Sequence, residues 1–421
     1  MSAPSIDRAE AERLDAADPL RGLRAAFEIP EAEPIYLDGN SLGRLPKATL
    51  ERLTALIRDE WGRDVVRGWE AWIELPGRIG DKIAAAFLGA GPGEVVIGDS
   101  TTVNLYRLAD AALEARRDRH VILASAGEFP TDRYVLQGLA EARGLEFRLL
   151  EPHRVAGLQA ADLVGSLGPE TALVVLSLVN YRSGALADLA AITAAAHAAG
   201  ALMLWDCSHA VGSVPIDLEG CGADLAVGCT YKYLNGGPGA PAFLYVRREL
   251  QDRLRQPIQG WFGQRDQFAM GHPYDPVPGI GRYLVGTPPV MAMAAVEASV
   301  DLLARTGIGP LREKSVALTE YLIRLWRTWL EPLGVALGSP EDPDRRGGHV
   351  GLRHPDAYRI DRALSERANV TCDFRAPDVI RLAPVAAYTR FVDVWDAMHR
   401  LRRLLESGEY LEMSGELRRV T

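Results

Sequence analysis

The sequence predicts an α/β protein in which a mainly parallel sheet is flanked by helices and is followed by a smaller α+β C-terminal domain. Between about residues 93 and 248, short apolar runs alternate with segments of helical periodicity. The runs are nearly continuous in apolar residues, as is typical of strands buried on both faces of a parallel sheet. After about Gly286 the pattern changes to longer helices and then to shorter elements. The two patterns together indicate a large sheet domain and a second, smaller domain.

Short apolar runs are the expected strands of the large sheet. They are VVIG (95–98), VILAS (121–125), EFRLLE (146–151), ALVVLSLV (172–179), ALMLWD (201–206), LAVG (225–228) and AFLYV (242–246). Between them, residues 102–117 and 188–200 have the spacing of amphipathic helices, and Gly200 is a natural helix end. Right-handed crossovers would place the strand C-termini along one edge of the sheet, where ligands usually bind.

The last third of the chain has its own helical pattern. Residues 291–306 and 315–332 repeat apolar side chains at helical spacing. We therefore expect residues 1–45 to form an arm that joins the small domain, residues 46–290 to form the large domain, and residues 291–421 to form the small C-terminal domain.

Composition excludes several classes of function. With 48% hydrophobic and 24% charged residues, the 421-residue chain has the balance of a globular protein. The net charge of -9, without a dense Lys/Arg run, argues against a nucleic-acid partner. The first residues are charged and no run of about 18 apolar residues occurs, so we expect no signal peptide, no membrane span and a cytoplasmic protein. The cysteines lack CxxC spacing and are expected to be unpaired thiols: Cys207, Cys221, Cys229 and Cys372.

Polar segments leave the expected strands at the ligand-binding edge. They are DSTT (99–102), FPTD (129–132), SLVNYRSG (177–184), WDCSH (205–209) and GCTYK (228–232). The last two bring Asp206, His209 and Lys232 to the strand ends. Each segment alone has an ordinary explanation, as a turn, a helix cap or a structural histidine. Their convergence on one sheet edge favours a cofactor site.

Pyridoxal phosphate needs such a set of groups. Its aldehyde requires a lysine amine, its ring nitrogen a buried carboxylate, and its phosphate a helix N-terminus with hydroxyls. Lys232, Asp206 and the DSTT segment supply these groups, and the glycines behind Lys232 permit close approach of the ring. The sequence contains no HExxH, GxxxxGK[ST] or GxSxG motif, and its histidines are scattered, so we expect no metal site.

The chain resembles the kynureninase family from about residue 35 to about residue 400. The resemblance lies in IYLDGNSLGRLP (35–46), EFPTD (128–132), WDCSHAVGSVPIDL (205–218), GCTYKYLNGGPG (228–239) and GWFG (260–263). It implies the fold of pyridoxal-phosphate transferases of type I, to which aspartate aminotransferase belongs. It also implies hydrolysis of L-kynurenine to anthranilate and L-alanine, in tryptophan catabolism and NAD biosynthesis, by a homodimer with shared active sites.

The resemblance implies a role for each matched residue. Lys232 would carry the cofactor, Asp206 would pair with its ring nitrogen, and Tyr231 would either donate a proton to the substrate's β-carbon or only anchor the phosphate. The further cofactor contacts it implies are Thr101, Thr102, Phe129, Asp132, Ser177 and His209, with Trp261 and Thr287 reaching the neighbouring subunit's phosphate. Arg381 would bind the substrate's α-carboxylate, and Ser41 and Trp69 would also contact the substrate. Without the resemblance, Arg381 could equally form a surface salt bridge.

Two departures from the family pattern lie near the expected aryl pocket. Ala386 and Ala387 stand where a proline and a leucine are expected before Tyr388, and residues 67–75 match loosely. The substrate could therefore be kynurenine, 3-hydroxykynurenine or another ring-substituted kynurenine of secondary metabolism. The pair at 286–287, Gly-Thr, resembles the bacterial pattern and favours kynurenine over its 3-hydroxy form.

Two other functions compete with this interpretation. A cysteine desulfurase or selenocysteine lyase of the same fold needs a reactive cysteine on a C-terminal loop, and Cys372 lies in that region. The alternation of TCDF (371–374) instead favours an inert, half-buried thiol. A pyridoxal-phosphate-binding regulator would need a DNA-binding domain, and the roughly 35 residues before the match are too short and too acidic for one.

Overall fold

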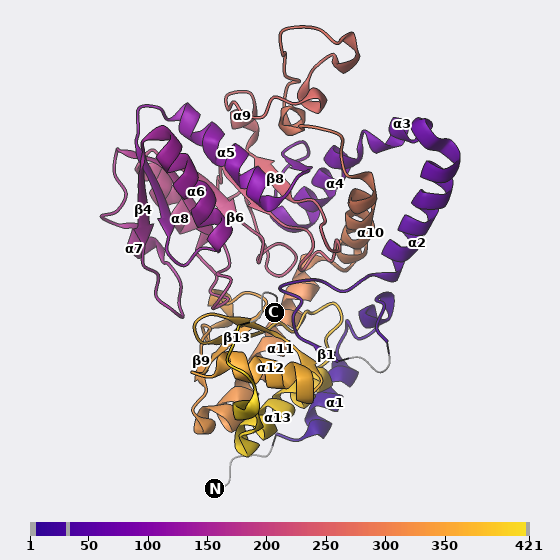
Figure 1. Ribbon diagram of the computed structural model, residues 1–421, viewed down its shortest axis with the longest axis vertical. Coiled ribbons are helices and arrows are strands. Elements are labelled where there is room, and N and C mark those ends of the chain that lie inside the picture. The colour runs from indigo at the N-terminus through magenta and orange to yellow at the C-terminus, as the bar shows by residue number, and fades with distance from the viewer. Residues whose placement is uncertain (1–5, 31–33, 418–421) are drawn as a thin grey trace.

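The computed structural model describes residues 6–30 and 34–417, which form a large upper part and a smaller lower part (Figure 1). In the described residues, the large part contains a seven-stranded sheet of order β2-β8-β7-β6-β5-β3-β4. Its strands are β2 (Val95–Ile97), β3 (Val121–Ser125), β4 (Glu146–Leu150), β5 (Thr171–Ser177), β6 (Leu202–Asp206), β7 (Leu225–Gly228) and β8 (Phe243–Val246). Only β8 runs antiparallel to its neighbours, so the predicted mainly parallel sheet is confirmed.

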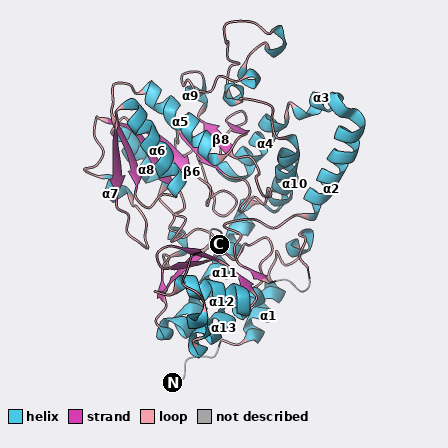
Figure 2. Ribbon diagram, viewed as in Figure 1, coloured by secondary structure: helices cyan, strands magenta, loops and turns pink. Residues whose placement is uncertain are grey.

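Helices cover both faces of this sheet (Figure 2). On one face, α5 (Thr101–Ala115) and α6 (Pro130–Arg143) share an apolar core with alternate strand residues such as Val96 and Ile122. On the other face, α4 (Leu75–Ile83), α8 (Leu189–Ala198) and α10 (Val290–Thr306) contribute to a second core. The shorter helices of this part are α3 (Trp69–Trp72), α7 (Ala160–Leu163) and α9 (Arg248–Gln251). Both faces of the central strands are therefore buried, as their unbroken apolar sequences predict.

The smaller part is built on a four-stranded antiparallel sheet of order β12-β13-β10-β9, as found in the described residues. Its strands are β9 (Ala336–Leu337), β10 (Val350–Arg353), β12 (Asp373–Arg375) and β13 (Val379–Leu382), and its helices are α11 (Ile308–Leu325), α12 (Ala357–Arg367) and α13 (Phe391–Ser407). Tyr321, Trp326 and Trp329 are buried in its separate apolar core. The predicted α+β character of the C-terminal region is confirmed.

The N-terminal residues lie against the smaller part. Helix α1 (Arg8–Ala17) packs on α13, and β1 (Ile35–Tyr36) pairs in parallel with β11 (Val370–Thr371). From there the chain crosses to α2 (Lys47–Ala55), which packs against α10 in the large part. The predicted large-domain boundary at residue 290 falls on the first residue of α10, a helix that packs on α2 and α4. The exact division into domains stays a prediction.

Local signals explain where the site-bearing helices begin and end. Ser100 is the N-cap of α5 and accepts a hydrogen bond from the Val103 N–H, and Pro130 occupies the first position of α6. After α8, Gly200 adopts a φ of 76°, which terminates the helix as its sequence predicts. Across residues 6–30 and 34–417, no helix is both long enough and apolar enough to cross a bilayer.

One buried ion pair joins the N-terminal segment to the smaller part, and its loss should destabilise the protein. Lys314 of α11 lies 2.7 Å from the Asp18 carboxylate, and both side chains are almost fully buried. Lys314→Met leaves the carboxylate buried without its partner, so we expect a loss of about 3–5 kcal/mol in urea unfolding followed by circular dichroism. The control is Glu406→Gln, which removes the exposed Arg402–Glu406 pair and should cost about 0.5 kcal/mol or less. Equal stability of the two variants would contradict this.

Candidate active site

Residues at or after the carboxyl ends of β2, β3, β6 and β7 line one cavity of about 460 Å³ at the carboxyl edge of the large sheet. Its wall includes Asp99, Ser100, Thr101, Thr102, Phe129, Asp132, Asp206, Ser208, His209, Tyr231 and Lys232. The volume suits a cofactor of modest size. The sheet therefore brings together four of the five polar segments predicted at its ligand-binding edge, and SLVNYRSG (177–184) does not line this cavity.

Lys232 follows β7 and extends its amine into this cavity. Its Nζ lies 3.3 Å from both ring nitrogens of His209 and 5.9 Å from the centre of the Phe129 ring. Burial lowers the pKa of Lys232 below its ordinary value. More of the amine is then neutral near pH 7, and the neutral form is the nucleophile.

Tyr231 also lines the cavity, beside the lysine. Burial raises the pKa of its phenol, so the hydroxyl keeps its proton over the physiological range. The carbonyl of Tyr231 accepts a 2.8 Å hydrogen bond from the N–H of Gly43. A Cβ on Gly43 would lie 2.3 Å from the Lys232 carbonyl oxygen, so only glycine allows this approach.

The glycines after Lys232 meet different needs. A Cβ on Gly236 would lie 2.9 Å from the Thr230 carbonyl oxygen, so its place is set by packing. Gly237 and Gly239 have φ values of 91° and 73°, which favour glycine in a turn. Of these three, Gly239 lines the cavity. The sequence predicts that these glycines permit close approach of a ligand, and only Gly239 is placed where it could do so.

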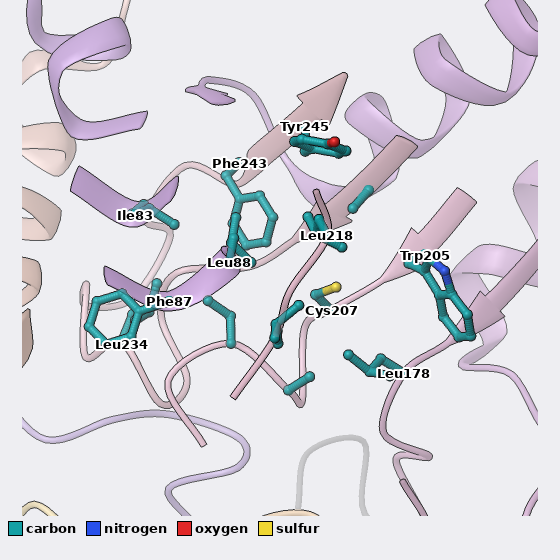
Figure 3. Close-up of a cluster of buried hydrophobic side chains, with 14 of the residues drawn as sticks. Ile83, Phe87, Leu88, Leu178, Trp205, Cys207, Leu218, Leu234, Phe243 and Tyr245 are labelled. Carbon is teal, nitrogen blue, oxygen red and sulfur yellow. The ribbon is translucent and has the colours of Figure 1, made fainter. Parts of the chain in front are cut away.

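Buried carboxylates form the floor of the site. In Figure 3 the side chains of Trp205 and Cys207 both lie in the apolar core, and alternation along the strand turns Asp206 the other way. Asp206 accepts a 2.7 Å hydrogen bond from the Ser208 N–H. Burial, reinforced by the charge of Asp206, raises the pKa of Asp132 well above its ordinary value. The Oδ2 atom of Asp132 is buried and has no hydrogen-bond partner in the protein.

A third buried carboxylate, Glu128, is hydrogen-bonded to Ser177. It accepts hydrogen bonds from the Ser177 N–H, at 2.9 Å, and from the Ser177 hydroxyl. Burial raises the pKa of Glu128 to about 7. Ser177 does not line the main cavity, so its predicted contact with a cofactor stays a prediction. Glu128 belongs to the EFPTD motif, but no pattern around it predicts a contact with Ser177.

Two further features suit a flat, phosphorylated ligand. Phe129 is 40% exposed in the cavity wall, and one edge of it meets the Tyr181 ring at a centroid distance of 5.3 Å. Opposite, the N-terminus of α5 presents the N–H groups of Thr101 and Thr102, which have no partner within the helix. The positive end of the helix dipole favours an anion at that point.

Arg381, predicted to bind a carboxylate, is buried rather than on the surface. Its Nε donates to Asp373 at 2.7 Å, its Nη1 to the Tyr181 carbonyl at 2.7 Å, and its Nη2 to the Ser41 hydroxyl at 3.1 Å. Nη1 also lies 3.4 Å from Nε2 of His209. The alternative of a surface salt bridge is wrong, because both members of the ion pair lie inside the protein.

Sequence reasoning missed several buried polar groups around Arg381. Asp373 is its cross-strand partner, Asp38 shares a hydrogen bond with Asp373, and the ring of His349 lies 5.8 Å from that of His209. Burial raises the pKa of Asp38 to about 8 and lowers that of His349 to about 3. The Asp373–Arg381 pairing had a signal in the sequence, because a hairpin turning near Pro377 would align these two positions.

Besides Ser41, Ser177 and Arg381, three more predicted site residues do not line the cavity of this chain. Trp69 packs edge-on against Trp72 and near Phe262. Trp261 begins a short turn and donates from its indole to the Gln267 carbonyl, and Thr287 is exposed on the next loop. Their predicted roles involve a substrate or a neighbouring subunit and stay predictions.

Cys372 is buried, and its sulfur lies 3.3 Å from an oxygen of Asp361. Burial raises the pKa of this thiol well above its ordinary value, which disfavours the reactive thiolate. Among the described residues the cysteines are free thiols. The environment of Cys372 therefore gives no support to a desulfurase mechanism.

Comparison with known proteins places the chain in a family. Residues 35–348 match the model described as Aminotransferase class-V, and residues 311–401 match the Kynureninase C-terminal domain. A kynureninase of Pseudomonas fluorescens is 41% identical, covering 96% of this chain and 97% of its own length. One of Burkholderia pseudomallei (strain 1106a) is 43% identical, covering 95% and 96%. The apo structure of a cysteine desulfurase from Thermococcus onnurineus NA1 shares the fold, with a TM-score of 0.81 at 18% identity over 92% of this chain and 98% of that one. The chain therefore belongs to the kynureninase family, whose members are hydrolases built on the class-V aminotransferase fold.

Proposed function

We propose that this chain hydrolyses the Cβ–Cγ bond of L-kynurenine to anthranilate and L-alanine, with pyridoxal phosphate bound at Lys232. One observation carries the proposal. In a chain of the kynureninase family, the Lys232 amine, the buried carboxylates Asp132 and Asp206, and the N-terminus of α5 border the same cavity. The Gly286-Thr287 pair favours kynurenine itself over the 3-hydroxy form.

The residues of the cavity fit this cofactor. The unpartnered Oδ2 atom of Asp132 and the buried carboxylate of Asp206 both require a positively charged or hydrogen-bond-donating neighbour, which a protonated ring nitrogen supplies. The open face of Phe129 suits an aromatic ring. The N–H groups of Thr101 and Thr102 suit a phosphate.

When bound, pyridoxal phosphate supplies a ring that withdraws electrons from the substrate's α-carbon. Hydrolysis places the hydroxyl of water on the γ-carbon, which becomes the carboxylate of anthranilate, and a proton on the β-carbon, which becomes the methyl group of alanine. Lys232 moves the proton at the α-carbon, because its lowered pKa leaves the amine able to accept one. Tyr231 supplies the proton to the β-carbon, because its raised pKa keeps the phenol protonated.

We also propose that two copies of the chain share their sites. Apolar side chains are exposed on the segment that continues α2, including Trp61 and Val66, and on the segment between α9 and α10, including Phe268. The second segment stands out at the top of Figure 1. Val66 is 72% exposed and Phe268 is 77% exposed, and a second copy seated on these segments would cover their apolar side chains. Trp261 lies beside Phe268, at a ring distance of 5.5 Å, so a second copy seated there would meet it.

Replacement of Lys232 should abolish both turnover and covalent attachment of the cofactor. We expect Lys232→Ala to lower kcat for kynurenine by on the order of 10³-fold or more, measured by anthranilate fluorescence. Borohydride treatment should label a peptide containing Lys232 in the wild type and no peptide in the variant. Lys82→Ala, in a partly buried ion pair of α4 outside the cavity, is the control and should keep the label. A label on another lysine would refute the assignment.

Tyr231→Phe separates proton transfer from phosphate anchoring. A proton donor predicts a fall of roughly 10²–10⁴ in kcat even when the cofactor is saturating. Anchoring alone predicts weaker cofactor binding with a nearly normal kcat. Tyr134→Phe, at an exposed position of α6, serves as the control. Full activity of Tyr231→Phe in excess cofactor would exclude the donor role.

Shared sites predict complementation between two inactive variants. We expect Lys232→Ala and Trp261→Ala to be impaired alone, and their mixture to recover activity after subunit exchange. Recovery should reach about a quarter of the wild-type level, because half of randomly paired dimers are mixed and each holds one intact site. Sedimentation velocity gives the state of each sample. A fully active monomer, or a mixture no more active than its components, would contradict shared sites.

A further inference from the structure

The salt bridge between Arg381 and Asp373 has the side-on, two-point geometry of a guanidinium bound to a carboxylate. The residues are opposite each other on β13 and β12, and each side chain is 1% exposed. Nε donates to Oδ1 at 2.7 Å and Nη2 donates to Oδ2. One edge of the arginine fork is therefore held by the protein's own carboxylate.

The other edge of Arg381 faces Ser41 and His209, of which His209 lines the cavity, and its Nη1 also donates to the Tyr181 carbonyl at 2.7 Å. Its Nη2 reaches the Ser41 hydroxyl at 3.1 Å, and its Nη1 lies 3.4 Å from Nε2 of His209, a distance at the weak limit of hydrogen bonding. The His209 ring in turn lies 3.3 Å from the Lys232 amine. A carboxylate that displaced the Ser41 and His209 contacts, while Nη1 kept its hydrogen bond to the Tyr181 carbonyl, would bind end-on to Arg381, next to the lysine.

Asp373 is fixed by more than Arg381. Its Oδ2 accepts a 2.6 Å hydrogen bond from the Ser41 hydroxyl and lies 2.8 Å from Nη2 of Arg375. Burial opposes its charge, but the hydrogen bond and charge of Arg381 outweigh it and lower the pKa of Asp373 to about 2. Asp373 is therefore ionised at every working pH.

The cluster keeps one unmatched positive charge at neutral pH. Arg375 and Arg381 carry two positive charges and Asp373 carries one negative charge, while Asp38, with a pKa of about 8, is mostly protonated. One further carboxylate would balance the site. The charge of Asp373 thus balances the charge of one of the two arginines. Its contacts with Arg381 are on the Nε–Nη2 edge and leave the Nη1–Nη2 edge to other partners.

We propose that Asp373 is a positioning residue for the substrate's α-carboxylate: it holds the Nε–Nη2 edge of Arg381 so that the Nη1–Nη2 edge binds the carboxylate beside Lys232. This inference rests on the proposed function, since it takes Arg381 as the carboxylate ligand. It assigns Asp373 an action through Arg381 and no contact with the reacting atoms.

The test compares Asp373→Asn with Asp378→Asn in the cofactor-loaded enzyme. Asp378 lies in the same hairpin but pairs with Arg353 and Arg154 instead. Loss of the Asp373 charge releases the arginine fork, so we expect KM for kynurenine to rise by about tenfold or more while kcat stays within about threefold. Asp378→Asn should leave both constants unchanged. An unchanged KM in Asp373→Asn, a fall confined to kcat, or an equal effect of Asp378→Asn would overturn the proposal.

A binding measurement makes the result independent of kynurenine turnover. The cofactor absorbance is titrated with L-alanine and with L-alaninamide, which lacks the carboxylate. Wild type should prefer L-alanine, and Asp373→Asn should lose most of that preference; an undiminished preference would overturn the proposal. Failure of the wild type to hydrolyse kynurenine would refute the proposed function while leaving this comparison valid. If Asp373→Asn does not fold, Asp373→Glu, which keeps the charge but shifts the fork by one methylene, should show the same loss, and wild-type discrimination in it would count against the proposal.

Discussion

Burial of three carboxylates at one edge of the parallel sheet is the constraint around which this site is organised. Glu128 and Asp132 follow β3 and Asp206 ends β6, each with less than a tenth of its surface exposed. Taking a carboxylate out of water is costly unless a donor or a cation meets it. Backbone N–H groups and the Ser177 hydroxyl meet part of that need. The rest falls to Lys232 and to whatever occupies the cavity, so the acidic floor selects a ligand with a protonated ring.

The arm of the chain completes the site from the opposite side. The loop that holds Ser41 and Gly43 is fastened to the smaller part, because the Leu37 N–H donates to the Thr371 carbonyl and the Ala383 N–H donates to the Leu37 carbonyl. In the same loop, the Gly43 N–H donates a hydrogen bond to the Tyr231 carbonyl. Backbone hydrogen bonds of this loop thus connect the segment that carries Lys232 with the part of the chain that carries Arg381.

The sheet and its ligand edge could be predicted from sequence because their signals are local. Unbroken apolar runs gave the strands, and the N-cap Ser100 and Gly200 marked helix ends within one or two residues. The network around Arg381 could not be predicted in the same way. Asp38, Asp373 and His349 come from three separated segments, and their proximity depends on strand register and on the packing of one part against the other. Glu128 was overlooked for a related reason, since its importance comes from Ser177, which the fold brings beside it.

The pairing of β1 with β11 determines when during synthesis the fold can be completed. Ile35 is in register with Val370 and its N–H donates to the Asn369 carbonyl, so the arm leaves the ribosome long before its partner strand exists. The sheet of the large part, whose strands all lie between these two points, can collapse during synthesis, since domains generally fold as units as they emerge. The loop that carries Lys232 is not covered by the arm until β11 has been synthesised and pairs with β1. Such long-range closure is intrinsically slow. The site around Lys232 and Arg381 is therefore completed only after β11 has been synthesised and has paired with β1.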